Sequence, residues 1–388
     1  MSVGNEFHDN RFLLDFWKDN YLKDYINHGG SKIKFITGRE GSGKSYALNQ
    51  FSKYADELGY ITVHFSAKDI CLYDFKDIYL EILKQSDIEE RLKECGDQLI
   101  IKMGYDPKEI PSDRTFVDWL ASRGEGDVLT KREIRDSLRR MFLRNPLLDY
   151  NFAGVCSIMT SGYLGHPGLD EATRELLMSW LMAEKTVSTA SLRALGLAPN
   201  KINKRNARHM LRSLAEVIHQ SGHAGLLITI DDLDVMQGKN GLEEIHYTKI
   251  RRDDTYESIR QLIDDIDSMH YIMFVFGFDH VLINNEKEGL KSYQALWMRI
   301  QNEVLASRFN RFTDIADLDQ LAAQVYTTDT VQELSLEFAE EMERNGESAD
   351  ILDEKQAKDL LDQLEYGTLG IMSLIKKTMK EHGGNDHV

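Results

Sequence analysis

The sequence predicts an α/β protein whose parallel sheet is flanked by helices. Short apolar runs at 33–37, 60–66, 226–230 and 271–276 have the length of β-strands. The later two, LLITI and YIMFVF, are apolar at nearly every position, which is typical of strands buried on both faces of a parallel sheet. Segments with the spacing of amphipathic helices lie between the runs, and strands that alternate with helices favour this architecture.

The composition indicates a soluble globular protein. The chain has 388 residues, enough for one large or two to three ordinary domains, with 42% hydrophobic and 29% charged residues. No apolar run approaches the length of a membrane span, and the polar N-terminus shows no secretory signal. Three widely spaced cysteines argue against a disulfide framework and against a cysteine-rich zinc site, so a cytoplasmic location is expected.

The elements divide the chain into five expected parts. Residues 1–30 predict one or two amphipathic helices that end at Gly29-Gly30. The first half of the core, 31–84, holds the strands at 33–37 and 60–66 and helices at 46–58 and 72–84. Residues 85–205 are mostly helical and predict a helical insertion. The second half of the core, 206–314, holds helices at 207–220 and 255–267 and the later two strands. From about residue 315 the pattern predicts helices only, in a lid-like C-terminal subdomain at 315–388.

Residues 38–45, GREGSGKS, fit the G-x-x-x-x-G-K-[ST] pattern of the phosphate-cradling loop, or P-loop, of nucleoside triphosphatases. The motif lies between a predicted strand and a predicted helix, a context that disfavours a simple glycine turn. Glycines let successive N–H groups point at phosphate oxygens, and the helix adds its positive N-terminal end. Lys44 is expected to reach the β- and γ-phosphates, and Ser45 to place its hydroxyl on Mg²⁺. The residues expected to bind the nucleotide are Gly38, Arg39, Glu40, Gly41, Ser42, Gly43, Lys44, Ser45 and Tyr46.

Three aspartates follow the predicted strand at 226–230. Parallel strands deliver their last residues to the carboxyl edge of the sheet, where ligands bind in open α/β folds. Asp231 is placed to hold Mg²⁺, and Asp232 to orient or deprotonate the attacking water. A second acid beside the metal acid is typical of ATPases that activate water themselves. Asp234 is either a further support of the metal site or a cap of the next segment.

Polar and basic residues after the last strand complete the candidate site. Asp279, with His280 behind it, is a candidate contact to the γ-phosphate or the water, although a helix cap is an equally good interpretation. An arginine that reaches the phosphate of a neighbouring subunit is also expected. Arg299, Arg308 and Arg311 are the candidates, and each is individually more typical of a structural arginine.

The formal charge of −17 disfavours long-range attraction to nucleic acid, so any such contact must be local. Two basic stretches have helical spacing. The first comprises Lys131, Arg132, Arg135, Arg139, Arg140 and Arg144, and the second comprises Lys201, Lys204, Arg205, Arg208 and Arg212. Solvated helix faces or contacts to acidic neighbours are the favoured interpretation, and a groove for DNA or a partner is the alternative.

Beyond the loop, an ordered set of segments resembles the BREX-type ATP-binding proteins of bacterial anti-phage defence, within the AAA+/STAND ATPases. The similarity covers about residues 12–315. The segments that carry it are YINHGG at 25–30 with the strand at 32–37, WLMAEKT at 180–186, LRALGL at 192–197, the helix before LLITIDD, and SYQAL at 292–296 with Arg299. The resemblance implies ATP binding, an AAA+-like P-loop core and partners such as a helicase, a methyltransferase or a nuclease.

Three departures from the family's pattern bear on catalysis. The second acid is Asp232 where glutamate is usual, so hydrolysis is expected to be slow. Gly277-Phe278-Asp279 replaces a threonine-containing turn after the last strand. No arginine in the C-terminal part is placed to sense phosphate, and Lys376 and Lys377 are poor substitutes.

The sequence therefore leaves three functions open. The first is a Mg²⁺-dependent ATPase that assembles or remodels a defence complex. The second is a non-hydrolysing nucleotide switch or scaffold, and the third is an initiator-like ATPase that grips DNA. A homo-oligomer is compatible with each of them, and no membrane partner is expected.

Overall fold

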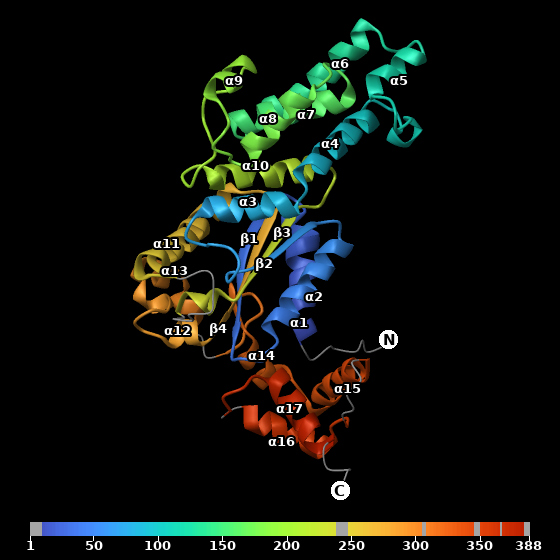
Figure 1. Ribbon diagram of the computed structural model, residues 1–388. Coiled ribbons are helices and arrows are strands. Elements are labelled where there is room, and N and C mark those ends of the chain that lie inside the picture. The colour runs from blue at the N-terminus through green and yellow to red at the C-terminus, as the bar shows by residue number, and fades with distance from the viewer. Residues whose placement is uncertain (1–9, 238–246, 305–307, 345–349, 365–366, 384–388) are drawn as a thin grey trace.

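The computed structural model describes residues 10–237, 247–304, 308–344, 350–364 and 367–383 (Figure 1). Its centre is a five-stranded parallel sheet in the order β2-β3-β4-β1-β5. The strands are β1 (Ser31–Gly38), β2 (Ile61–Ser66), β3 (Leu226–Asp231), β4 (Ile272–Asp279) and β5 (Ile315–Asp317). The predicted α/β class with a parallel sheet is confirmed.

Both faces of the sheet are buried because alternate side chains enter two different cores. In β4, Phe274 and Phe276 pack into one core, whereas Met273 and Val275 pack into the other. The first core is covered by α3 (Phe75–Gln85), α10 (Ala207–Gln220), α11 (Lys249–Asp265) and α13 (Gln294–Val304). The second is covered by α1 (Asn10–Trp17), the π-helix η1 (Lys18–Ile26) and α2 (Lys44–Glu57).

Two strand predictions need correction. β4 continues to Asp279, which pairs with Gly38, so Gly277-Phe278-Asp279 belongs to the strand and is not a turn after it. The expectation of helices only after about residue 315 is also wrong, because β5 pairs with residues 35–37 of β1 at the edge of the sheet. A strand of three residues is too short to show a period in the sequence.

Helices between β2 and β3 form an extension that we call the helical arm, α4 to α9. It comprises α4 (Ile88–Lys102), the 3₁₀-helix η2 (Pro107–Glu109), α5 (Phe116–Ser122), α6 (Val128–Leu138), the π-helix η3 (Arg139–Leu143), α7 (Tyr150–Leu164), α8 (Glu171–Leu181) and α9 (Thr189–Ala194). Aspartate side chains accept hydrogen bonds from the first turns of α4, α6, α7 and α8, which fixes where these helices begin. His223, just before β3, lies 3.0 Å from Glu94 of α4, so the arm starts at the amino ends of the strands.

The last helices lie at the opposite, carboxyl end of the sheet (Figure 1). They are α14 (Leu318–Val325), α15 (Thr328–Arg344), α16 (Glu354–Leu364) and α17 (Ile371–Gly383), and we call α15 to α17 the C-terminal helices. Shorter helices complete the described chain: η4 (Leu233–Gln237), η5 (Ile266–Ser268), α12 (Val281–Asn284) and η6 (Leu290–Ser292). No described helix is both long and apolar enough to cross a bilayer.

Candidate nucleotide-binding site

The loop between β1 and α2 has a conformation that depends on its glycines. Gly41 and Gly43 have φ values of 74° and 97°, in the left-handed region that other residues enter only at a cost. Ser42 is buried between them, and its N–H donates to the carbonyl of Arg39 at 3.1 Å. Helix α2 begins directly at Lys44, so its first N–H groups face the loop. The loop therefore has a backbone conformation compatible with an anion cradle, and phosphate binding by it stays a prediction.

Lys44 folds back over this loop. Its Nζ donates to the carbonyl oxygens of Gly38 at 3.1 Å and Arg39 at 2.9 Å, and lies 3.5 Å from the Asp279 carboxylate. The ammonium group is therefore held at the carboxyl ends of β1 and β4, where a phosphate seated in the loop would lie. Asp279 also accepts a hydrogen bond from Val281 N–H, in the first turn of α12, at 3.0 Å, although the residue at the N-cap position of that helix is His280. A contact of Asp279 with the γ-phosphate or the water stays a prediction.

Ser45 and Asp231 meet although 186 residues separate them in the chain. The Ser45 hydroxyl donates to Asp231 Oδ2 at 2.5 Å, and Asp231 is 7% exposed. Gly277 of the neighbouring strand allows this placement, because a Cβ there would lie 2.7 Å from Asp231 Oδ1. A hydroxyl and a carboxylate side by side are oxygen ligands of the kind that Mg²⁺ prefers, so the donor set fits this ion.

Asp232 is held in an unusual position. Its φ of 57° is left-handed, and its carboxylate accepts hydrogen bonds from Lys68 Nζ and Ser66 Oγ, both at 2.7 Å. Burial by itself would raise the pKa of Asp232, but these two hydrogen bonds and the charges of Lys68 and Lys44 outweigh burial and lower it. The side chain is therefore a carboxylate with both oxygens already engaged.

Asp234 acts on the site indirectly, through the main chain of Asp279. Its carboxylate accepts a hydrogen bond from the N–H of Asp279 at 2.9 Å. Burial, followed by the charges of Asp279 and Asp232, raises its pKa above the usual value, although hydrogen bonds to the backbone oppose this shift. Asp234 therefore positions the end of β4.

Arg39 points away from the loop and joins it to the C-terminal part of the chain. Its guanidinium donates to Leu364 O at 2.9 Å and to Gly367 O, and it pairs with Asp319 at 3.2 Å. Asp319 also accepts from the Arg39 backbone N–H at 2.6 Å. Only the main chain of Arg39 is thus placed to face a nucleotide, and the side chain has a structural contact that the motif gave no reason to expect.

His280 extends this ion-pair cluster. Its Nε2 lies 3.0 Å from Asp317, and its Nδ1 lies 3.7 Å from Asp319. Burial lowers the pKa of His280, but the hydrogen bond and charge of Asp317 and the charges of Asp319 and Asp279 outweigh burial and raise it. His280, Asp317 and Asp319 could together ligate a metal ion, but Asp319 is already paired with Arg39, so we treat the group as an ion-pair cluster.

The start of α17 covers the outer side of the P-loop. Gly370 N–H donates to Glu40 O at 2.8 Å, and Ser373 N–H donates to Gly41 O at 3.1 Å. The approach is close enough that a Cβ on Gly370 would lie 2.3 Å from the Ser42 nitrogen. The C-terminal helices therefore contact the loop through its main chain.

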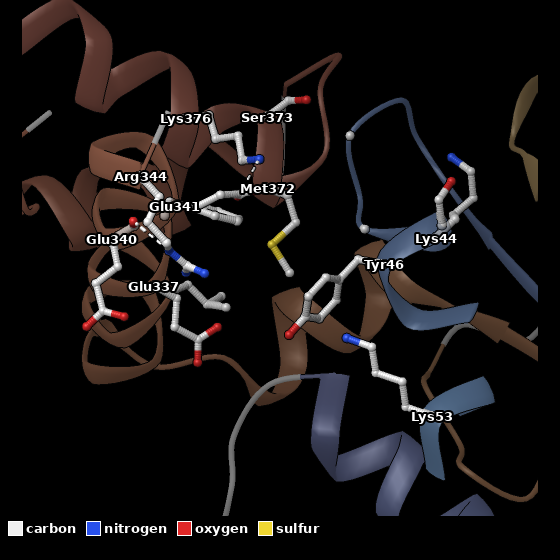
Figure 2. Close-up of a pocket in the computed structure, with 15 residues that line it drawn as sticks. Lys44, Tyr46, Lys53, Glu337, Glu340, Glu341, Arg344, Met372, Ser373 and Lys376 are labelled. Atoms are coloured by element: carbon white, nitrogen blue, oxygen red, sulfur yellow. Dashed lines mark hydrogen bonds and ion pairs between the residues drawn. The ribbon is translucent and has the colours of Figure 1, made fainter. Parts of the chain in front are cut away.

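A cavity of about 700 Å³ opens beside the loop, between α2 and the C-terminal helices (Figure 2). The ring of Tyr46, which is 47% exposed, and the thioether of Met372, which lies against the loop at Gly43, both line it. Charged side chains form its outer part: Lys53, Glu337, Glu340, Glu341, Arg344 and Lys376. The sequence identified Tyr46 but not the wall on α15 and α17, since nothing local in residues 334–376 marks them as neighbours of the loop.

The candidate arginines lie apart from this centre. Arg299 forms a bidentate ion pair with Asp264, with N–O distances of 2.5 and 2.7 Å. It also lines a small cavity at the amino end of β1, together with Ser31 and Lys32. Arg311 stacks over the ring of Phe16 at 4.5 Å, and Arg308 is exposed. Within one chain these arginines do not reach the loop, so a role at a neighbouring subunit stays a prediction.

Two comparisons with known proteins bear on the family of the chain. No curated protein is significantly similar to the chain. The sequence model of a family described as "BREX system ATP-binding protein BrxC/D" matches residues 20–377, which span the P-loop, the five strands and most of α17. Because this match covers most of the 388 residues, the chain belongs to the BREX system ATP-binding protein BrxC/D family.

Proposed function

We propose that the chain binds ATP with Mg²⁺ at the carboxyl edge of its sheet and hydrolyses it slowly, as an AAA+-like component of BREX phage defence. The contact between Ser45 and Asp231 carries this proposal, because it joins the P-loop to the acid of a distant strand at 2.5 Å. Main-chain N–H groups of the loop and the ammonium of Lys44 would hold the β- and γ-phosphates. Ser45 and Asp231 would hold Mg²⁺, which when bound offsets phosphate charge.

The cavity next to the loop supplies room for the rest of the nucleotide. Its volume of about 700 Å³ lies in the usual range of small-ligand sites. Tyr46 offers a flat aromatic ring and Met372 an apolar, polarisable side chain to this cavity, and both kinds of surface suit a purine ring. Because α15 and α17 provide one wall, a bound nucleotide would contact both the core and the C-terminal helices. ATP binding is thereby proposed to set the position of these helices and to control assembly with other defence proteins.

The state of Asp232 supports slow turnover. A carboxylate that orients or deprotonates water needs an oxygen within hydrogen-bonding distance of that water. Both oxygens of Asp232 are engaged by Lys68 and Ser66, and its lowered pKa makes it a weaker base. We propose that Asp232 activates water only when its contact with Lys68 loosens.

The same observation favours a second candidate, a switch that binds ATP without useful turnover. In that case the pair of Lys68 and Asp232 is structural, and ATP binding alone sets the position of the C-terminal helices. The two candidates share their binding chemistry and differ in what Asp232 does.

Nucleotide binding and turnover by the purified full chain distinguish the candidates. Asp231→Ala is expected to lose the Mg²⁺-dependent part of ATP affinity. Asp232→Asn should keep ATP affinity but lose turnover if the chain is an ATPase, and should leave phage protection intact if it is a switch. Asp113→Asn, at an exposed position of the arm, is the matched control. Wild-type protein that binds no ATP with or without Mg²⁺ would refute both candidates.

A further inference from the structure

The two basic stretches of the sequence have different surroundings in the structure. In the second stretch, Lys204 pairs with Asp254 at 3.0 Å and Arg208 with Asp265 at 3.3 Å, both on α11. Arg212 donates to Leu147 O at 3.1 Å, and Lys201 to Lys185 O at 2.9 Å. Contacts within the chain therefore account for most of this stretch.

The first stretch lies on α6 and η3 of the helical arm. The side chains that these helices bury are apolar: Ile134, Leu138, Met141 and Phe142. A basic side chain recurs every four residues along one edge of these helices, at Lys131, Arg135 and Arg139. Arg132 lies beside them. We call these four side chains the basic edge. At 1.5 Å per residue it is about 12 Å long.

Little negative charge neutralises the basic edge. Among the described residues, no carboxylate lies within ion-pair distance of Lys131 or Arg135, and Arg132 and Arg139 share Asp136 at 3.8 and 3.6 Å. The side chains of Arg132 and Arg139 are 74% and 58% exposed, so these contacts are weak. Residues 128–144 carry six basic and two acidic side chains in a chain whose net charge is −17.

His166, after α7, lies close enough to the basic edge for two of its cations to act on the imidazole. Burial and then the charges of Arg135 and Lys131 lower its pKa, and its buried Nε2 has no hydrogen-bond partner. Positive potential therefore extends from the edge across the neighbouring loop. The arm also carries this potential away from the acidic body, because the 15 residues of α4 span about 22 Å, about two Debye lengths at 0.1 M salt.

We propose that the basic edge of α6 and η3 binds the sugar–phosphate backbone of duplex DNA. Arginine guanidinium groups match phosphate oxygens in pairs, and three of the four side chains are arginines. Over 12 Å, each DNA strand presents about three phosphates, so the spacing of charge on the two surfaces is similar. Contacts to phosphates carry no sequence information, so this binding should be independent of DNA sequence and dependent on salt.

An acidic protein segment is the competing occupant. Val128 and Leu129 at the start of α6 are 77% and 72% exposed and would suit apolar anchors of a protein. The number of cations on one edge favours phosphate, and the test below includes an acidic peptide to separate the two.

Fluorescence anisotropy of a short labelled duplex, titrated with the full chain without nucleotide, tests this proposal. Wild-type protein should bind with an affinity that falls as salt rises from about 50 to about 200 mM, with a log–log slope of about −3 to −4 for four phosphates. The variant K131E/R135E/R139E should lose at least about tenfold in affinity and most of this slope.

The control K185E/K287E/K355E changes the net charge equally at exposed positions outside the edge and should bind DNA within about threefold of wild type. Circular dichroism shows whether each variant keeps its helices. Absence of wild-type binding at low salt, or an equal loss in both triple variants, overturns the proposal. So does a polyglutamate peptide that displaces the duplex at equal charge concentration, since that assigns the edge to an acidic protein.

Discussion

The helical arm and the C-terminal helices lie at opposite ends of one sheet and relate differently to the nucleotide site. The C-terminal helices contact the P-loop through main-chain hydrogen bonds from Gly370 and Ser373, and they form one wall of the cavity. No described residue of the helical arm lines that cavity. The two helical regions thus differ in their contact with the candidate nucleotide site. A nucleotide bound at the proposed site would contact the C-terminal helices directly, whereas the helical arm would not touch it.

Lys44→Ala gives the largest expected effect and tests this separation. Loss of the ammonium from the phosphate site should weaken ATP binding by at least about 2 kcal/mol, or about 30-fold. Binding of duplex DNA by the basic edge should not change, because Lys44 lies at the other end of the sheet. The two affinities are measured on the same preparation. A parallel loss of DNA affinity would show that the two ends are coupled.

Arg39→Ala tests whether the side chain joins the loop to the C-terminal helices. It removes hydrogen bonds to Leu364 O and Gly367 O and leaves the buried carboxylate of Asp319 without its main cation. The free energy of unfolding should fall by about 2–3 kcal/mol, measured by urea denaturation, and ATP affinity should fall with it. Arg39→Lys, which keeps the charge but not the planar donors, should lie between wild type and alanine. If alanine affects neither quantity, the contact has no stabilising role.

Gly370→Ala sharpens the comparison because it disturbs only the contact between the start of α17 and the P-loop. The added Cβ would meet the Ser42 nitrogen at 2.3 Å, so either the loop or the helix must shift. We expect a loss of about 1–2 kcal/mol in stability together with weaker ATP binding. Gly168→Ala on the arm, where no atom lies within 4 Å of the new Cβ, is the control and should change neither. Thermal melts with and without ATP measure both effects.

The pH dependence of stability is the smallest expected effect. Charges of Asp317, Asp319 and Asp279 face His280 and raise its pKa in the folded state despite burial. The stabilisation from the His280 cation is therefore complete below about pH 6.5 and is lost as the pH rises through the raised value. Urea denaturation at several pH values should show this loss in wild type and a flatter profile in His280→Gln. Equal profiles would exclude His280 as the source.

Local sequence signals identified the residues that meet at the candidate phosphate site but not the residues that hold them in place. The spacing within 38–45 and the acid after a buried strand are local patterns, and they placed Lys44, Ser45 and Asp231 where the structure has them. The contacts of Lys68 with Asp232 and of Arg39 with Asp319 join residues far apart in sequence. Charged residues give no periodic signal that names a distant partner, so these pairs depended on the fold.

Lys34 shows the same limit within the core. The strand prediction at 33–37 included this residue, yet a lysine there suggests an exposed position. In the structure Lys34 is fully buried. Its ammonium donates to Thr313 O at 2.6 Å, lies 3.0 Å from Asp314 and sits over the Tyr21 ring at 4.6 Å. The segment before β5 supplies Thr313 and Asp314, and η1 supplies Tyr21. The sequence named neither segment as a neighbour of Lys34, and β5 itself was too short to predict.

The contact between α17 and the P-loop also determines which truncated fragment of the chain would still bind a nucleotide. A fragment that stops before Gly370 would leave the carbonyl groups of Glu40 and Gly41 without their donors and would remove Met372 from the cavity. The smallest unit able to retain a nucleotide therefore extends from β1 through the beginning of α17, almost to the end of the chain. The rate of nucleotide release would then depend on how often α17 separates from the P-loop.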